Sequence, residues 1–269
     1  MKHLGNLKTE YVDQYDKSLL ERIERAPRRE GYIQMYGYDV WTAFEFSFLL
    51  SSGLPVTKVI RIFTNAENPY IFESKSLKLY LNSFNNTKFK IEQEALHQVQ
   101  TDLSEVAGGR VRVVEVQEFP EPKLYSKSLT LQGTDDGEEY SYDYNNLLLK
   151  TVEHRYQNSQ TFHTDLLRSN CEITNQPDFG RCFVSIITKD KLIDPQSLLR
   201  YIVSYRNHQE FHEPTCERIF QDLYNVLEPI QLMVICQYTR RGGIDINPIR
   251  SLKPIGEEIC FDLPKLIQQ

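Results

Sequence analysis

An internal repeat constrains the fold of this 269-residue chain more than any other feature. The stretch SLKLYLNSFNNTKF, which starts at Ser76, resembles SLLRYIVSYRNHQEF, which starts at Ser197, 121 positions later. At this offset the identical residues are Ser76, Leu77, Tyr80, Ser83 and Asn86, which fall on Ser197, Leu198, Tyr201, Ser204 and Asn207. Chance similarity between two amphipathic helices is the alternative explanation. The repeat otherwise predicts two copies of one module.

The elements expected around the two stretches come in the same order. Each stretch is followed by a helical pattern (residues 95–106 and 216–227) and then by a β-branched strand (residues 110–116 and 230–239). Two apolar strands precede each stretch, at 39–50 and 57–65 and again at 163–170 and 181–189. Sequential strands with short connections favour antiparallel sheets with a pair of helices on one face. The expected class is therefore α+β, with two tandem modules.

An acidic, glycine-containing stretch, LQGTDDGEEYSYDYNN, covers residues 131–146 between the copies. Its composition is typical of a solvated linker or a long surface loop, and we attach no function to it. We therefore expect an N-terminal module over residues 1–146, which ends in this linker, and a C-terminal module over residues 147–269.

Composition and charge exclude several classes of protein. A hydrophobic content of 40% supplies a core, and a net charge of −6 argues against a nucleic-acid scaffold. The five cysteines are widely spaced, with no CxxC pair, which fits neither a disulfide framework nor a zinc site. The first residues form no apolar signal core, and no run is long enough to span a membrane. We expect a cytoplasmic, soluble protein without a metal.

The segment CEITNQPDFG places Cys171 seven residues before Asp178. A thiol at a strand end with a carboxyl group nearby could serve as a nucleophile with an acid partner. The alternative is a small buried thiol before an ordinary turn that contains Asp178.

Three further segments carry polar residues in patterns that allow chemistry. In NHQEFHEP, His212 could carry a proton and Glu213 could accept ligand N–H groups, or both could simply begin a helix. In NPYIFESKSLKLY, Glu73 could belong to a solvated helix N-terminus, and Lys75 could be ordinary surface charge. In TRRGGIDINP, Arg241 and Gly242 could grip a phosphate or form a tight turn between strands.

Taken together, ESKSLKLYLNSFN, CEITNQPDFG, EFHEPTCERIF and TRRGGIDINP resemble, in this order, the NADPH-dependent 7-cyano-7-deazaguanine reductases, the QueF nitrile reductases. The resemblance runs over most of the chain and matches the long, two-module branch of the family. It implies the tunnelling fold, whose strand–strand–helix–helix–strand–strand modules agree with the repeat.

The resemblance also implies an activity. The family reduces the nitrile of 7-cyano-7-deazaguanine to the amine of 7-aminomethyl-7-deazaguanine, on the route to the tRNA nucleoside queuosine. This four-electron reduction uses two NADPH. The resemblance implies no metal and no direct contact with nucleic acid or membrane. The family further suggests a homodimer of two-module chains.

By similarity, each candidate residue takes a role. Cys171 adds to the nitrile carbon to form a covalent thioimide, Asp178 protonates the nitrogen, and His212 handles protons beside the substrate. Substrate-binding positions match Glu73, Ser74, Lys75, His212 and Glu213, and NADPH-binding positions match Lys75, Ser76, Arg241 and Gly242. Phe179 stands where many long members have tryptophan, which affects only fine packing.

Two other functions remain possible at this point. A cysteine-dependent nitrile or amide hydrolase would resolve the adduct with water, but its usual base and lysine partners are not identifiable near Cys171. A non-catalytic purine- or pterin-binding member of the same superfamily would use Glu213 and not Cys171. Because each copy holds only some of the motifs, we expect Glu73 and Cys171 to face one ligand across the module interface.

Overall fold

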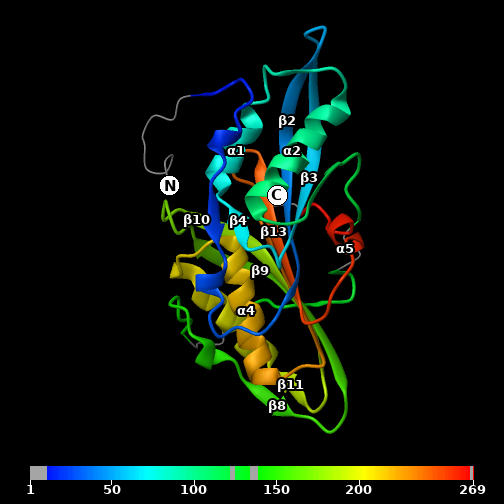
Figure 1. Ribbon diagram of the computed structural model, residues 1–269. Coiled ribbons are helices and arrows are strands. Elements are labelled where there is room, and N and C mark those ends of the chain that lie inside the picture. Colours follow the sequence, from blue (N-terminus) through cyan, green and yellow to red (C-terminus); the bar gives the residue numbers. More distant parts are fainter. Residues whose placement is uncertain (1–10, 122–124, 134–138, 267–268) are drawn as a thin grey trace. The chain divides into compact units, whose positions relative to one another are not determined.

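The computed structural model describes residues 11–121, 125–133, 139–266 and 269 (Figure 1). Its described residues form two compact units. Unit 1 takes its residues from Met1–Gly31, Tyr38–Phe119 and Arg240–Ile246, and unit 2 from Tyr32–Gly37, Pro120–Thr239 and Asn247–Gln269. The expected division at residue 146 differs from these limits and stays a prediction.

Unit 1 combines short and long strands with two helices. Its elements are η1 (Lys17–Leu19), β1 (Arg22–Glu24), η2 (Ala26–Arg28), most of β2 (Tyr36–Leu50), β3 (Pro55–Asn65), β4 (Tyr70–Phe72), α1 (Ser74–Asn82), β5 (Lys88–Phe89), α2 (Glu92–Ala107) and β6 (Val111–Glu115). Strand β3 runs antiparallel to both β2 and β6, β1 pairs antiparallel with β4, and β5 adds a short parallel pairing to β2.

One hydrophobic core joins the long strands of unit 1 to both helices. Trp41 and Phe46 of β2 share this core with Leu77 of α1 and Val99 of α2. A bulge in β2 between Ala43 and Phe46 shifts the strand alternation by one residue. The apolar residues on both sides of the bulge can therefore face the same core.

Unit 2 repeats this arrangement with additions. Its elements are β7 (Leu129–Thr130), η4 (Asn146–Leu148), β8 (Thr151–Glu153), β9 (Asn158–Asn170), β10 (Pro177–Thr188), β11 (Lys191–Ile193), α3 (Pro195–Val203), η5 (Ser204–Asn207), α4 (His212–Leu227), β12 (Gln231–Tyr238), most of β13 (Ile244–Ser251) and α5 (Glu258–Phe261). Strand β10 lies antiparallel between β9 and β12, and β12 pairs antiparallel with the end of β13. Strand β8 pairs with β11, and β7 adds a short parallel pairing to β9.

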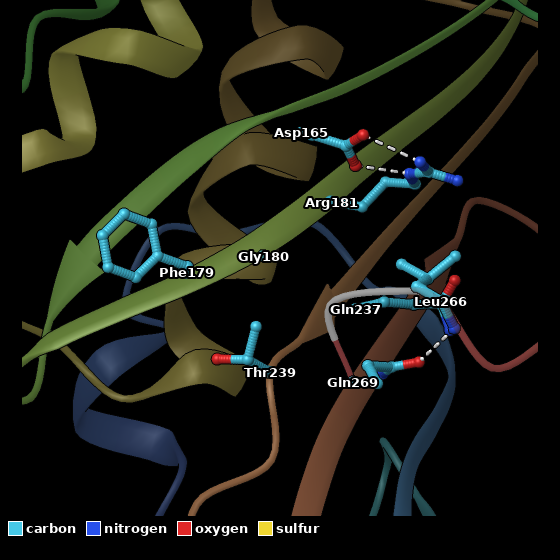
Figure 2. A pocket seen from close by; sticks show the side chains of 8 residues that line it. All are labelled: Asp165, Phe179, Gly180, Arg181, Gln237, Thr239, Leu266 and Gln269. Atoms are coloured by element: carbon cyan, nitrogen blue, oxygen red, sulfur yellow. Dashed lines mark hydrogen bonds and ion pairs between the residues drawn. The ribbon is translucent and has the colours of Figure 1, made fainter.

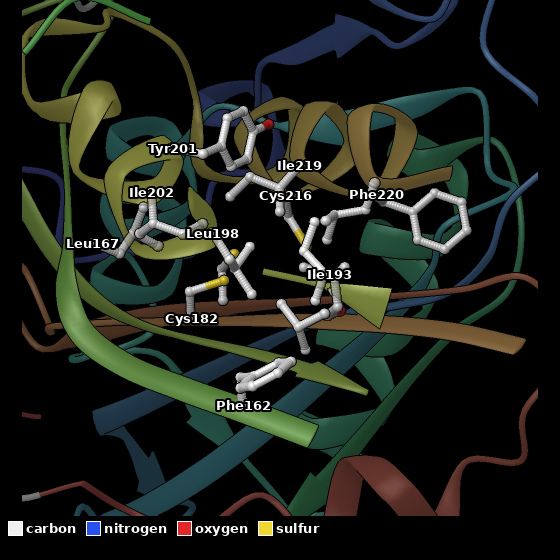
Figure 3. Packing of buried hydrophobic residues seen from close by; sticks show 14 of the residues in the cluster. Phe162, Leu167, Cys182, Ile193, Leu198, Tyr201, Ile202, Cys216, Ile219 and Phe220 are labelled. Atoms are coloured by element: carbon white, nitrogen blue, oxygen red, sulfur yellow. Dashed lines mark hydrogen bonds between the residues drawn. The ribbon is translucent and has the colours of Figure 1, made fainter. Parts of the chain in front are cut away.

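The core of unit 2 lies between its strands and the helix pair α3 and α4 (Figure 3). Leu198 and Tyr201 of α3 and Ile219 of α4 pack over Phe162 of β9 and Cys182 of β10. The predicted α+β class, with antiparallel sheets and helices on one face, is therefore confirmed. Among the described residues, no helix has the length and apolar character needed to cross a membrane.

Equivalent hydrogen bonds, and not only the same order of elements, occur within each of the two units. Glu73 caps α1 by accepting the N–H of Ser76, and Asp194, 121 residues later, caps α3 by accepting the N–H of Ser197. The buried hydroxyls of the paired tyrosines also match: Tyr80 donates to Asp102 at 2.7 Å, and Tyr201 donates to Asp222 at 2.6 Å. Chance similarity between two helices does not explain these matched contacts.

The strand bulge recurs at the same offset. In β2 the register shifts between Ala43 and Phe46, and in the β9–β10 ladder it shifts opposite Gly180 and Cys182, between Thr164 and Leu167 of β9. Because positions 43 and 46 correspond to 164 and 167, the bulge provides a structural alignment of the two strands. This alignment shows what each unit holds at equivalent places.

The acidic stretch only partly fits the expectation of a solvated loop. Residues 134–138 lie outside the described residues, and several of its described residues are exposed. However, Tyr144 donates its hydroxyl to Asp222 at 2.8 Å, which anchors the end of the stretch to α4.

Candidate active site

Cys171 follows β9 directly, at the start of the turn that leads into β10. Its N–H donates to the carbonyl of Gln176 at 2.9 Å, and its carbonyl accepts the N–H of Asn175 at 2.9 Å. Asn175 has φ 56°, a left-handed conformation that asparagine tolerates better than most residues. Two bonds therefore hold the backbone of Cys171, while its thiol is free and half-buried.

Asp178 lies in β10 and not in the turn. It pairs with Ser169 of β9 and is 7% exposed, which differs from an ordinary exposed turn aspartate. The bond from Cys171 to Gln176 extends the pairing past the end of β9. Because side chains alternate along paired strands, Cys171 falls on the same face as Ser169 and Asp178.

The start of α4 places His212 against this face. Its Nε2 atom lies 3.2 Å from Oδ2 of Asp178, and its ring stacks on the ring of Tyr238 with centroids 3.8 Å apart. The loop before α4 is bonded to the end of β9, since Asn170 donates its N–H to the carbonyl of His208 at 2.8 Å. The hairpin and the helix start therefore form one polar cluster within unit 2.

An ion pair stabilises this loop. Arg218 forms a bidentate contact with Glu210 at 2.9 and 3.2 Å, and His208 lies 3.0 Å from the same carboxylate. Burial alone would raise the pKa of Glu210, but hydrogen bonds from His208 and Arg218 outweigh it and lower the pKa. The ionised carboxylate thus helps to hold the loop that leads into His212.

The alignment of the units shows that the shared scaffold does not require this cluster. In unit 1 the strand pair Phe48 and Val56 occupies the place of Ser169 and Asp178. Leu50 stands where unit 2 has Cys171. Ser169 and Asp178 are buried, and buried polar residues cost stability unless they gain partners or a function. The substitutions therefore indicate a functional site.

Glu213 is the second residue of α4. A carboxylate in a first turn complements the helix dipole, as expected, but this role works on an exposed surface. Glu213 is 2% exposed, so this helix start is buried and not solvated. The burial is consistent with a ligand-binding role.

The remaining candidates lie in unit 1, at the start of α1. Both oxygens of the Glu73 carboxylate accept backbone N–H groups, from Lys75 at 3.0 Å and from Ser76 at 2.7 Å. Glu73 is 2% exposed, so this helix N-terminus is buried and not solvated. Ser74 is exposed and Lys75 is half-buried.

Ser76 has a clear structural role. Its hydroxyl donates to the carbonyl of Glu73 at 2.8 Å and accepts the N–H of Glu21 at 3.0 Å. Ser197 makes the equivalent bonds in unit 2, to Asp194 and from Lys150. A contact between Ser76 and NADPH stays a prediction. Lys75, in contrast to Ser76, is not repeated in unit 2, where Gln196 occupies the equivalent position.

The RRGG segment forms a tight turn between strands, which was one of the two possibilities that the sequence allowed. Arg241 and Ile244 exchange backbone hydrogen bonds at 2.8 and 3.3 Å, and Gly242 and Gly243 have φ of 60° and 84°. A Cβ on Gly242 would lie 2.5 Å from Nζ of Lys78, on α1. The turn therefore passes close to the Lys78 amine. A glycine turn, which lets a ligand approach the backbone, and a lysine amine both suit an anionic ligand.

A cavity in unit 2 is lined by the face of β10 opposite to Asp178 (Figure 2). It measures about 270 Å³, and its lining includes Phe179, Arg181, Gln237 and Gln269. Its polar groups are engaged with the protein: Arg181 forms a bidentate contact with Asp165 at 2.6 and 2.8 Å. None of the predicted site residues lines it.

The predicted residues thus fall into two groups. Cys171, Asp178, His212 and Glu213 lie in unit 2, and Glu73, Ser74, Lys75, Ser76, Arg241 and Gly242 lie in unit 1. That Glu73 and Cys171 face one ligand stays a prediction. Within the described parts of the chain, no group of three or more His, Cys, Asp or Glu side chains is arranged to hold a metal ion. The expected absence of a metal also stays a prediction.

Sequence reasoning missed two residues of the unit 2 cluster, Ser169 and Tyr238. A signal for Ser169 existed in the repeat, because it falls on Phe48 at the offset of 121. Tyr238 lies at the end of a plain apolar strand, and the sequence offers no comparable signal for it.

The fold and this cluster define a duplicated α+β protein that carries a thiol, a carboxyl group and an imidazole in one of its two units, as cysteine-dependent enzymes do. Comparison with known proteins specifies the class. Residues 11–115 match the model described as "Nitrile reductase, 7-cyano-7-deazaguanine-reductase N-term", and residues 177–255 match that described as "QueF-like protein". Cys171 lies between the two matched ranges.

A curated relative covers the whole arrangement. The NADPH-dependent 7-cyano-7-deazaguanine reductase of Paracidovorax citrulli (strain AAC00-1) is 41% identical over 257 residues, which is 91% of each chain. The chain therefore belongs to the family of NADPH-dependent 7-cyano-7-deazaguanine reductases. Among solved structures, the crystal structure of the archaeosine synthase QueF-Like in the apo form matches 38% of this chain and 91% of that chain. The two chains are 16% identical, with a TM-score of 0.30.

Proposed function

We propose that this protein reduces the nitrile of 7-cyano-7-deazaguanine to the primary amine of 7-aminomethyl-7-deazaguanine with NADPH. The named relative supports the substrate and the cofactor. The single observation that carries the proposal is the polar cluster of unit 2, where Cys171 and Asp178 replace two apolar residues of the repeated scaffold. The amine product would serve queuosine biosynthesis, in the cytoplasm.

The first step is the addition of the Cys171 thiol to the nitrile carbon. A carbon–sulfur bond forms while the S–H bond and one π bond of the nitrile break. Asp178 donates a proton to the nitrogen, and the proton released by the thiol replaces it. The product is a covalent thioimide, whose C=N carbon accepts a hydride more readily than the nitrile does. His212, with Nε2 at 3.2 Å from Asp178, is placed to return the proton to that carboxyl group.

NADPH supplies the hydride, and two are consumed because the change from nitrile to amine takes four electrons. Reduction of the thioimide carbon and departure of the Cys171 thiolate leave an imine, which the second reduction converts to the amine. We propose that Lys75, Arg241 and Gly242 bind the cofactor, with Ser76 supporting the start of α1. The glycine turn beside Lys78 fits an anionic group, since no Cβ occupies the space next to the amine.

Carboxylates suit the substrate because its purine-like edge presents N–H donors. Glu213 and Glu73 are both buried and both accept hydrogen bonds when ionised, so each can hold such a donor. Ser74 and Lys75 complete the predicted substrate-binding positions. We further propose a homodimer as the working form.

One assay tests the proposal and its alternatives. The protein is mixed with NADPH and 7-cyano-7-deazaguanine, and the nicotinamide absorbance and the nitrile are followed together. Folded protein that oxidises no NADPH is not a reductase. Loss of the nitrile without NADPH oxidation indicates a hydrolase, and binding without turnover indicates a non-catalytic purine-binding protein.

Intact-mass measurement with substrate alone tests the mechanism. Cys171→Ala is expected to abolish both the adduct and turnover, whereas Cys260→Ala, which removes a buried thiol elsewhere in unit 2, should retain both. An adduct that persists in Cys171→Ala identifies another nucleophile. Asp178→Asn should bind substrate and slow the chemistry, and unchanged turnover would remove Asp178 from the role of acid.

A further inference from the structure

The ring of Tyr238 stacks on the His212 imidazole. The two rings are nearly parallel, with an interplanar angle of 15° and centroids 3.8 Å apart. Tyr238 is the last residue of β12 and is fully buried, so its own position is fixed by the core of unit 2. The stack therefore joins His212 to the rigid part of the unit.

Hydrogen bonds alone do not orient this imidazole. Its Nε2 atom contacts Asp178 at 3.2 Å, while Nδ1 is buried and has no hydrogen-bond partner among the described residues. In most functional histidines the second ring nitrogen is bonded to a carbonyl or carboxylate, which fixes the plane of the ring. Here Nδ1 has no such bond among the described residues, so the stack with Tyr238 supplies the second contact that defines the plane of the ring.

Gly180 makes room for the stacked ring. It pairs with Tyr238 across β10 and β12, and a Cβ at this position would lie 3.1 Å from Cδ1 of that ring and 2.8 Å from the carbonyl of Gln237. In unit 1 the equivalent strand position is Lys58, whose amine pairs with Glu92 at the start of α2 at 2.7 Å. The glycine of the QPDFG segment thus replaces a large side chain at the place where unit 2 holds Tyr238 and His212.

We propose that Tyr238 is a positioning residue for the reaction and that Gly180 provides the space for its ring. The ring fixes the plane of the His212 imidazole so that Nε2 faces Asp178. The positioning role belongs to the ring and not to the phenol hydroxyl, which is buried and interacts with Ser169. This inference rests on the proposed function and adds a residue to it.

Two variants of Tyr238 separate the ring from the hydroxyl. Tyr238→Phe keeps the stack and is expected to match the wild type. Tyr238→Leu removes the stack, so kcat should fall by roughly 10- to 100-fold with a smaller change in KM, since misplacement of a catalytic group by about 1 Å has such an effect. Phe220→Leu is the matched control, because it removes a buried aromatic ring from the same core (Figure 3), two turns further along α4 than His212.

The second readout is the NMR spectrum of the His212 ring protons, which lie over the Tyr238 ring and carry its ring-current shift. Tyr238→Leu should move these signals, whereas Tyr238→Phe and Phe220→Leu should leave them in place. If Tyr238→Leu does not fold, Tyr238→Met refills more of the volume and is read in the same way.

Three results overturn the inference. Unmoved His212 signals in Tyr238→Leu would show that the rings are not stacked. Moved signals with unchanged kcat would show that the stack does not position a catalytic group. A loss of kcat in Tyr238→Phe equal to that in Tyr238→Leu would assign the effect to the hydroxyl. Failure of the proposed reduction shows separately, as a wild-type protein that oxidises no NADPH.

Discussion

Removal of one buried hydroxyl, in Tyr201→Phe, should destabilise the protein by an amount that depends on pH. Tyr201 is fully buried and donates to Oδ2 of Asp222 at 2.6 Å. Burial raises the pKa of Asp222 above its ordinary value of 3.8, and the hydrogen bonds from Tyr201 and Tyr144 oppose this rise. Tyr201 thus stabilises a carboxylate that burial disfavours.

The structure bounds the magnitude. A hydrogen bond to a charged group contributes about 1.5–3 kcal/mol. Asp222 keeps the bond from Tyr144 at 2.8 Å in the variant, but the buried Tyr205 hydroxyl, 2.7 Å from that of Tyr201, also loses a partner. The expected loss of unfolding free energy is therefore about 1.5–3 kcal/mol near neutral pH.

The sign of the pH dependence follows from the carboxyl group. Its folded-state pKa is raised, so the ionised form costs stability at high pH, and the cost disappears as the pH falls through the raised pKa. Without the Tyr201 donor, ionisation of Asp222 lowers the free energy of unfolding by a larger amount. The difference between wild type and Tyr201→Phe is therefore expected to be largest where Asp222 is ionised in the folded state and to shrink as acidification protonates it, towards the ordinary pKa of 3.8.

Tyr80→Phe in unit 1 is the matched control. Its acceptor, Asp102, keeps bonds from Tyr15 at 2.9 Å and Gln98 at 3.1 Å and an ion pair with Lys17 at 3.4 Å. We expect a smaller loss than for Tyr201→Phe. Urea unfolding at equal protein concentrations measures both. Equal losses for the two variants, or a Tyr201→Phe loss that grows on acidification, would refute the reasoning.

Three further predictions concern the cofactor turn and acid stability. Gly242→Ala should weaken NADPH binding by about 5- to 30-fold, because a left-handed alanine costs roughly 1–2 kcal/mol and its Cβ meets the Lys78 amine. Fluorescence titration measures the affinity. The control is Gly53→Ala, which also has a positive φ but no atom within 4 Å of its Cβ, and it should bind NADPH normally. Lys75→Met should raise KM for NADPH while the intact-mass adduct at Cys171 still forms, and an unchanged KM would remove Lys75 from the cofactor site. Because the folded-state pKa of Glu210 is lowered, its contribution to stability is present above the ordinary pKa of 4.5 and lost as the pH falls below it; Glu210→Gln should flatten the acid limb of the unfolding curve, and an unaltered limb would contradict the assignment.

Much of the architecture could be predicted from the sequence because the relevant contacts are local. The repeated serine and tyrosine positions make bonds within or next to their own helix, such as Ser83 to Tyr80 at 2.6 Å and Ser204 to Tyr201 at 2.7 Å. Such contacts leave a fixed spacing in the sequence. The predicted helices and strands were accordingly found in the predicted order.

The neighbours of the site residues could not be predicted in the same way. Asp178 meets His212 34 positions later, and His212 meets Tyr238 26 positions later. These contacts depend on strand register and on where a helix starts against a sheet, and a shift of one residue would turn each strand side chain to the other face. No local pattern carries that information.

The amino-acid sequence by itself determined that the chain is a duplicated α+β protein and that the segment with Cys171 and Asp178 occurs in only one of the copies. Hydrophobic periodicity and fixed spacing carry that information, because they reflect short-range geometry. Only the tertiary structure decided that Asp178 lies inside a strand against His212, and that Tyr238 supports this imidazole in the space left by Gly180. These arrangements arise when distant segments pack together, so they exist only in the folded chain.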